Sequence, residues 1–284
     1  MISEAEVRRL AARWQVDPMI LDLDYSLGWF LAALAATPGA SQKLCFKGGT
    51  CLRKCYFPGY RFSEDLDFTA NSYITPDDLT GWIEQTAGWS VNRDGPDFLA
   101  APYRFETVED EYGKETYQVR VYYRGPLRWG GSPRAIRVDI TRDERLLLPA
   151  VSRSLSHTYS DGSELSGTEV SCYSLVEILS EKMRAICGQR RFAISRDLYD
   201  IHRLVQSGIS FQDLVSLLPD KFQSRGVDIA SLDVSLLEKR RKDYELDWKR
   251  RLDYLIPDSD AVTFGEAWQS TIAVIQQVQD LTKG

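Results

Sequence analysis

Histidine is scarce in this chain of 284 residues, which contains only His157 and His202. Two histidines give poor support to a histidine-based metal site, or to a nucleophile activated by histidine. The chain also has few cysteines, odd in number and without a Cys-x-x-Cys pair: Cys45, Cys51, Cys55, Cys172 and Cys187. This pattern favours buried, reduced thiols over a zinc site or a disulfide framework.

Long apolar runs and an excess of positive charge are lacking as well. No apolar run approaches the length that spans a bilayer, and the N-terminus lacks the basic and apolar segments of a secretion signal. We therefore expect a cytoplasmic protein that does not bind a membrane. The formal net charge of −6 argues against a general nucleic-acid coat protein. It still allows a nucleic-acid substrate that is held by a local basic patch.

The most informative segment places a double glycine just before a pair of aspartates. Lys47–Thr50 follows a short apolar strand predicted for residues 44–46 and opens a short helix predicted for residues 50–56. Backbone N–H groups at such a helix start favour an anionic phosphate. Asp65 and Asp67 lie two residues apart on a predicted strand, so both side chains point to one face. Carboxylates beside a phosphate require a divalent cation, and this combination predicts nucleotidyl transfer.

Asp139 is the natural third carboxylate. It lies between Val138 and Ile140 in a strand predicted for residues 135–140. A carboxylate in such an apolar strand is costly unless it is paired or bound to a metal. The alternative is a salt-bridged or capped aspartate at the end of a strand.

The segments Phe46–Arg53 and Arg61–Phe68 resemble the glycine motif and the metal motif of the AbiEii/AbiGii-type toxins, a family of the nucleotidyltransferase superfamily. The resemblance implies an α/β domain with a mixed sheet, followed by a helical domain, with the active site between the two lobes. It implies the toxin of a type IV toxin–antitoxin or abortive-infection system for phage defence, with a cognate antitoxin as partner. Some relatives transfer nucleotides from an NTP to the 3′ end of tRNA, so tRNA is the expected acceptor.

Within this interpretation, Asp65, Asp67 and Asp139 hold two Mg²⁺ ions and carry catalysis. The expected nucleotide-binding residues comprise a phosphate cradle and three cations that neutralise charge: Gly48, Gly49, Thr50 and Ser63 for the cradle, and Lys47, Arg53 and Arg61 for the cations. Arg53 could equally be a solvated base on the short helix.

Two helical motifs in the second half of the chain also resemble the family. Lys182 lies at the edge of the apolar stripe of the helix predicted for residues 173–187, where it could reach a triphosphate or only snorkel over the core. The segment 195–201 resembles an Arg-Asp-x-x-Asp motif. Asp197 is a candidate catalytic residue, with a structural alternative in which Ser195 caps the helix and Asp197 complements its dipole. Asp200 shares its face.

Basic residues crowd the loop between these helices and are candidate RNA contacts: Arg184, Arg190, Arg191 and Arg196. The clusters 239–242 and 249–251 are interleaved with acids, which favours a solvated helix face.

The order of the predicted elements gives two domains. Helices at 4–14 and 18–35, a helix at 76–87 and strands within 89–140 form an α/β domain over residues 1–165. Residues 166–284 form the helical domain. Two alternative functions stay open at this point: nucleotidylation of a protein or a small molecule, and a catalytically silent nucleotide-binding interaction protein.

Overall fold

The structure is a computed structural model that describes residues 1–109, 115–128, 130–190 and 192–283. The chain divides into two units. Unit 1 comprises Met1–Glu144, Ala150–Cys172 and Pro257–Asp260. Unit 2 comprises Arg145–Pro149, Tyr173–Ile256 and Ala261–Gly284. The division at residue 165 that the sequence suggests stays a prediction.

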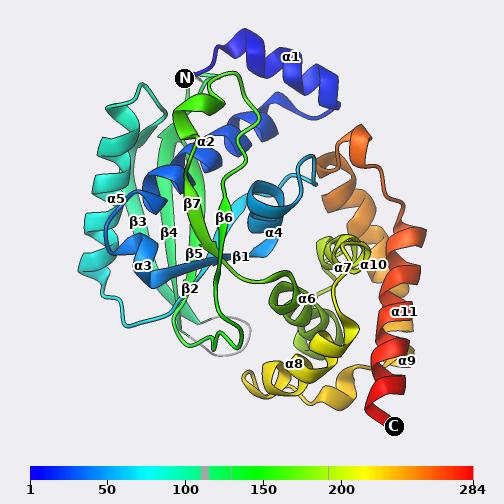
Figure 1. The fold of residues 1–284 in the computed structure, drawn as a ribbon. Helices are drawn as coiled ribbons and strands as arrows, with labels where there is room; N and C mark the ends of the chain where they lie inside the picture. Colours follow the sequence, from blue (N-terminus) through cyan, green and yellow to red (C-terminus); the bar gives the residue numbers. More distant parts are fainter. Residues whose placement is uncertain (110–114, 129, 191, 284) are drawn as a thin grey trace. The chain divides into compact units, whose positions relative to one another are not determined.

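Unit 1 is built on a mixed β-sheet (Figure 1). Within the described residues its strand order is β3-β4-β5-β2-β1-β7-β6. The pairs β2–β5 and β1–β7 are parallel, and the other neighbours are antiparallel. The strands are β1 (Leu44–Lys47), β2 (Asp65–Ala70), β3 (Asp97–Glu109), β4 (Glu115–Arg124), β5 (Arg134–Thr141), β6 (Val151–Ser154) and β7 (Glu169–Cys172). This confirms the mixed α/β class expected from the sequence.

Helices α2 and α5 pack against each other in unit 1 (Figure 1). Asp17 caps α2 and Pro18 occupies its first turn, while Thr75 and Asp78 form a capping box at the start of α5. The helical segments of this unit are α1 (Glu4–Trp14), α2 (Pro18–Ala35), α3 (Ala40–Lys43), α4 (Gly48–Cys51), the π-helical turn η1 (Leu52–Tyr56), α5 (Pro76–Val91), and the 3₁₀ turns η2 (Gly162–Leu165) and η7 (Asp258–Asp260).

Helix α2 corrects the expectation that no apolar run is long enough to span a bilayer. Its 18 residues are long and apolar enough by length and composition. However, 78% of that stretch is buried inside the protein, as in the core helix of a soluble domain. The composition of α2 is therefore weak support for a membrane span.

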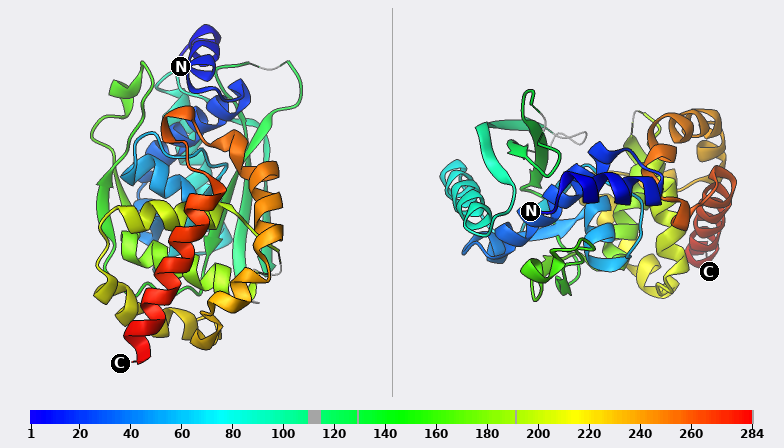
Figure 2. Two further views of the ribbon diagram at one scale, coloured as in Figure 1. Left: turned by 90° about the vertical axis from the view of Figure 1, so that its right-hand side faces the viewer. Right: turned by 90° about the horizontal axis from the view of Figure 1, so that it is seen from above.

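Unit 2 is helical in its described residues, and α11 packs against α7 and α8 (Figure 2). Its segments are α6 (Leu175–Arg184), η3 (Ala185–Gln189), α7 (Arg196–Gln206), α8 (Phe211–Gln223), η4 (Ile229–Ser231), α9 (Val234–Glu238), α10 (Arg241–Asp247), η5 (Trp248–Leu252), η6 (Asp253–Leu255) and α11 (Phe264–Lys283).

Two helical segments differ from the sequence-based prediction. Helix α5 runs to Val91, four residues beyond the predicted end, which removes Trp89–Val91 from the strand region. The helix predicted for residues 50–56 begins at Gly48 and becomes a π-helical turn from Leu52. Such turns are rare and are found frequently at functional sites.

Candidate active site

Asp65, Asp67 and Asp139 lie on one face of two neighbouring interior strands of unit 1. Asp67 of β2 is the direct register partner of Asp139 of β5. Because strand side chains alternate, Asp65 shares this face with both. The other face carries Leu66 and Val138, which are buried. The sheet thus brings together the three predicted carboxylates, and β2 is not an edge strand, because β1 and β5 flank it.

Arg137 is the residue that the sequence analysis missed at this site. Its guanidinium contacts Asp65 Oδ2 at 2.6 Å and Asp139 Oδ2 at 3.1 Å. Partial burial lowers the pKa of Arg137, but the carboxylates of Asp65 and Asp139 outweigh this and raise it above its ordinary value. Alternation alone could have placed Arg137 on the Asp139 face, since the two lie two residues apart on β5.

The donor set fits a hard divalent cation. Carboxylate oxygens are the ligands that Mg²⁺ prefers, and Gln118 of β4 donates to Asp139 Oδ1 at 3.0 Å, which orients that carboxylate. A positive group, the Arg137 guanidinium, already bridges Asp65 and Asp139. Asp65, Asp67 and Asp139 therefore offer the ligand type of a magnesium site, and Arg137 holds two of them in this structure.

The double glycine is required by its surroundings. Gly48 has a φ of +79°, and a Cβ there would overlap the Asp67 carboxylate. At Gly49 an added Cβ would lie 2.5 Å from a guanidinium nitrogen of Arg61 and 3.1 Å from Ser63 Oγ. The glycine turn therefore lies directly against the carboxylate site and against two of the predicted phosphate-binding residues. Lys47 also belongs here, because it is the register partner of Asp67 on β1.

Gly48→Ala is expected to disturb the Asp67 carboxylate as well as the backbone. The positive φ alone should cost about 1–2 kcal/mol of stability, and the overlap with Asp67 should also lower the transfer rate. Gly59→Ala is the matched control, because Gly59 has a φ of +80° but nothing within 4 Å of an added Cβ. Melting curves and transfer rates of both variants test this. Equal transfer rates in the two variants would show that the close approach of Gly48 to Asp67 does not contribute to activity.

Two predicted nucleotide-binding residues have other partners. Arg53 is only 8% exposed and pairs with Asp24 at 2.6 Å, so it is not a solvated base and its guanidinium is used within the core of unit 1. Lys54 pairs with the same carboxylate at 2.7 Å. Burial would raise the pKa of Asp24, but the charges of Arg53 and Lys54 hold it well below its ordinary value. The Thr50 hydroxyl donates to the Asp65 carbonyl at 2.5 Å, which ties the glycine turn to β2.

A second cluster lies within unit 2. Lys182 of α6 contacts Asp197 at 2.8 Å and Asp200 at 2.9 Å, both on α7. Arg190 lies 3.4 Å from Asp197. Burial would raise the pKa of Asp197, but the charges of Arg190 and Lys182 hold it below its ordinary value. The structure thus brings together the family-like lysine and both aspartates, and Lys182 does not merely snorkel over apolar surface.

Several expectations about the neighbouring residues need correction. Ser195 does not cap α7 with its side chain, because its hydroxyl donates to Asp247 at 2.7 Å. Arg184 is not an accessible RNA contact, since it is 4% exposed and donates to the Lys221 carbonyl at 2.7 Å. Arg190 is engaged with Asp197, and Arg196 is half-buried at the start of α7. Arg191 lies outside the described residues.

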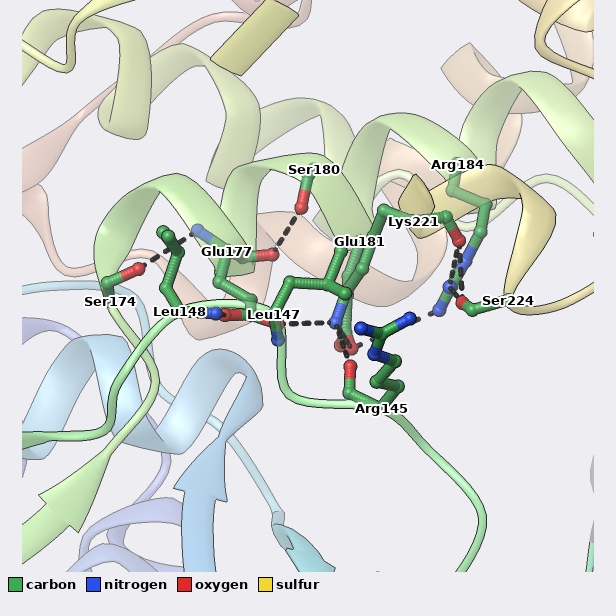
Figure 3. Close-up of polar contacts among 10 residues, drawn as sticks. All are labelled: Arg145, Leu147, Leu148, Ser174, Glu177, Ser180, Glu181, Arg184, Lys221 and Ser224. Atoms are coloured by element: carbon green, nitrogen blue, oxygen red, sulfur yellow. Dashed lines mark hydrogen bonds and ion pairs between the residues drawn. The ribbon is translucent and has the colours of Figure 1, made fainter. Parts of the chain in front are cut away.

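Glu177 lies at the centre of a buried polar network in unit 2, shown in Figure 3. Its carboxylate accepts the N–H groups of Leu147 and Leu148 at 2.8 and 2.9 Å. It also pairs with Lys221 of α8 at 2.7 Å, and both side chains are fully buried. Lys221 in turn donates to the Arg145 carbonyl at 3.2 Å. This network fastens residues 145–149 to α6 and α8 within unit 2.

The mixed sheet of unit 1, with three carboxylates on one face beside a glycine turn, is what the sequence analysis expected of a nucleotidyltransferase. The family described as "Nucleotidyl transferase AbiEii toxin, Type IV TA system" matches residues 29–274. The chain therefore belongs to the AbiEii toxin family of type IV toxin–antitoxin systems, as the sequence resemblance predicted.

Solved structures of low sequence identity share the fold. MenT4, a nucleotidyltransferase toxin from Mycobacterium tuberculosis H37Rv, is 19% identical with a TM-score of 0.64, and the match covers 99% of this chain and 90% of MenT4. JHP933 from Helicobacter pylori is also 19% identical, with a TM-score of 0.57 and coverage of 94% of this chain and 95% of JHP933. No curated protein matches the sequence.

Proposed function

We propose that this toxin is a Mg²⁺-dependent enzyme that transfers nucleotides from an NTP to the 3′ end of tRNA. The observation that carries the proposal is the set of three carboxylates on adjacent strands beside the glycine turn. Asp65, Asp67 and Asp139 share one face of the sheet, and Gly48 leaves no room for a side chain between the backbone and Asp67. Membership of a nucleotidyltransferase family supports the same reaction class.

The three carboxylates would together hold two Mg²⁺ ions. When bound, Mg²⁺ neutralises the triphosphate and lowers the pKa of the attacking hydroxyl. Arg137 would give up its contacts with Asp65 and Asp139 when the cation arrives, and its guanidinium would then be available to phosphate oxygens. The N–H groups of the glycine turn, with Lys47, Arg61 and Ser63 next to it, would receive the phosphates.

Lys182 would contribute charge to nucleotide binding in unit 2. Its ammonium is held between Asp197 and Asp200, so its position is fixed before any ligand binds. Asp197 and Asp200 are then positioning residues for Lys182. We place the enzyme in the cytoplasm, where NTPs and tRNA occur, and expect a cognate antitoxin and a role in phage defence from its family.

The acceptor is proposed from the family and from a basic hollow on unit 2. Arg240, Arg250 and Arg251 line a hollow of about 650 Å³ together with Phe192, whose side chain is 68% exposed. Asp243 and Asp247 also line it, and Asp247 lies 3.6 Å from Arg251, so the arginines exceed the acids by one charge. Cationic side chains beside an exposed aromatic ring suit a single-stranded RNA end, because phosphates meet charge and bases stack on the ring. This surface replaces Arg184 as the candidate RNA contact.

The direct test incubates the purified protein with Mg²⁺, each labelled NTP in turn, and total tRNA. Labelled tRNA that forms with Mg²⁺ and does not form with EDTA is the expected result. Label on protein instead of RNA would favour the alternative acceptor class, a protein target. Absence of transfer to any acceptor, by a protein that still binds NTP, would favour the catalytically silent alternative.

Arg250→Glu combined with Arg251→Glu should raise the apparent KM for tRNA by about tenfold or more, with the KM for NTP unchanged. Each lost phosphate contact should also flatten the slope of log affinity against log salt by about 0.7–0.9. Lys239→Glu combined with Lys242→Glu is the control, since it makes the same change in charge at exposed positions outside the hollow. Equal tRNA binding in the two double variants would exclude the hollow from the RNA path.

A further inference from the structure

Three cysteines from two distant parts of the sequence meet inside unit 1. Cys51 ends α4, Cys55 lies in η1 and Cys172 ends β7. Their sulfur atoms all lie within 4.8 Å of one another, and all three residues are buried. The spacing of Cys51 and Cys55 places them one helical turn apart, but only the fold brings Cys172 to them.

The protonation of this cluster is uneven. Hydrogen bonds from the thiols of Cys172 and Cys51, together with the charges of Lys54 and Arg153, lower the pKa of Cys55 to about 5. Burial raises the pKa of Cys51 well above its ordinary value. Of the three cysteines, Cys55 is therefore the one whose thiolate form is most favoured, while the Cys172 thiol donates to the Val170 carbonyl at 3.4 Å. Thiolate is the form of cysteine that binds metals.

We propose that Cys51, Cys55 and Cys172 form a binding site for a thiophilic d¹⁰ cation, Zn²⁺ or Cu⁺. A Zn–S bond of about 2.3 Å places tetrahedral thiolates about 3.8 Å apart, and the three sulfurs lie within 4.8 Å of one another. Soft thiolate ligands select Zn²⁺ and Cu⁺ over Mg²⁺. The site therefore differs in ligand chemistry from the carboxylates of Asp65, Asp67 and Asp139.

Binding at this site exchanges protons for the metal. The three cysteines would form three metal–sulfur bonds as thiolates, and each thiol proton present beforehand would be released to solvent. Three thiolates with Zn²⁺ leave a net charge of −1, and with Cu⁺ a net charge of −2. Lys54 and Arg153 lie close enough to act on the Cys55 charge and would offset this negative charge.

The metal would link the helix that contains the glycine turn to strand β7 of the sheet. Cys51 lies in the same four-residue helix as Gly48 and Gly49, and Cys172 of β7 is the register partner of Phe46 of β1. A bond through the metal would therefore join the segment that carries the glycine turn to the strand beside β1. This role does not depend on the proposed transfer reaction.

The test uses the full chain, purified under reducing conditions without chelator from cultures supplemented with Zn²⁺ or with copper. We expect about one metal ion per chain by elemental mass spectrometry, and the two cultures distinguish the two ions. Cys55→Ser should lower the metal content by about tenfold or more. Cys187→Ser, which changes a free cysteine of unit 2, should leave it unchanged.

A second measurement needs no variant and so does not depend on the folding of Cys55→Ser. Metal-stripped wild-type protein is titrated anaerobically with Co²⁺ as a probe for Zn²⁺, or with Cu⁺, and followed by thiolate-to-metal absorption and by the melting temperature. Saturable absorption with a higher melting temperature is the expected result. The proposal is overturned if the protein retains neither ion and neither ion produces absorption, provided that all three thiols react with a thiol reagent after unfolding and are therefore reduced. It is also overturned if mass spectrometry finds a disulfide among the three cysteines.

Discussion

Asp67→Asn should lower the rate of nucleotidyl transfer by more than about 10³-fold, the scale of removing one preorganised electrostatic group. Asparagine has nearly the same shape as aspartate, so the strand pairs of Asp67 with Lys47 and Asp139 should persist. The variant loses a negative charge that would bind metal and loses no apolar packing, because the buried face of β2 carries Leu66 and Phe68. The melting temperature should therefore change little.

Steady-state transfer rates over a range of Mg²⁺ concentrations provide the measurement. Asp77→Asn is the control, because Asp77 is an exposed acid in the first turn of α5 and makes the same change in charge away from the site. A rate for Asp67→Asn within tenfold of wild type would remove Asp67 from the metal set. A strong loss of stability in that variant would instead indicate a structural role.

The common face of Asp65 and Asp67 could be predicted because it depends on neighbours in the sequence, whereas the role of these residues stays a prediction. Alternation along a strand places Asp65 and Asp67 on a common face. The apolar neighbours of Asp139 indicate that its carboxylate needs a partner, because a carboxylate in an apolar strand is otherwise costly. The pairing of Asp67 with Asp139 could be seen only in the structure. It depends on the register of two strands about seventy residues apart, and neither segment alone determines that register. Arg137 was missed for the same reason, since its contact with Asp65 crosses from β5 to β2.

Other contacts were missed for a second reason. Where a neighbour in the sequence already accounts for a residue, nothing in the local pattern indicates a further partner that is distant in the sequence. Glu177 follows Ser174 at the spacing of a helix cap, and the Ser174 hydroxyl does accept its N–H at 3.3 Å. That motif accounts for the backbone but not for the carboxylate, whose partners lie about thirty and forty-four residues away. Arg53 was likewise judged by its place on a short helix, although its partner Asp24 lies on α2.

Glu177→Gln should destabilise unit 2 by about 1.5–3 kcal/mol, because the ammonium of Lys221 loses its fully buried partner and keeps Glu181, at 3.2 Å, as a carboxylate partner. Glutamine keeps the length of the side chain, so little of the loss would come from a cavity. It also weakens the acceptor of the Leu147 and Leu148 N–H groups, which are charge-assisted hydrogen bonds in the wild type. At about 2–4 °C per kcal/mol, calorimetry should record a fall of roughly 3–12 °C in the melting temperature.

The exposed pair Glu245 and Lys249 of unit 2 provides the control, because it has a similar separation of 3.0 Å but both side chains are largely in water. Glu245→Gln should change stability by less than about 0.5 kcal/mol. Lys221→Met in the Glu177→Gln background should recover part of the loss, since it removes the buried ammonium, while Glu181, which Lys221 also contacts at 3.2 Å, has a partly exposed side chain. If the double variant were instead as unstable as the sum of the two single variants, the two residues would not interact as a pair. The loss would then come from the separate contacts of Glu177 with the 147–148 backbone and of Lys221 with the Arg145 carbonyl.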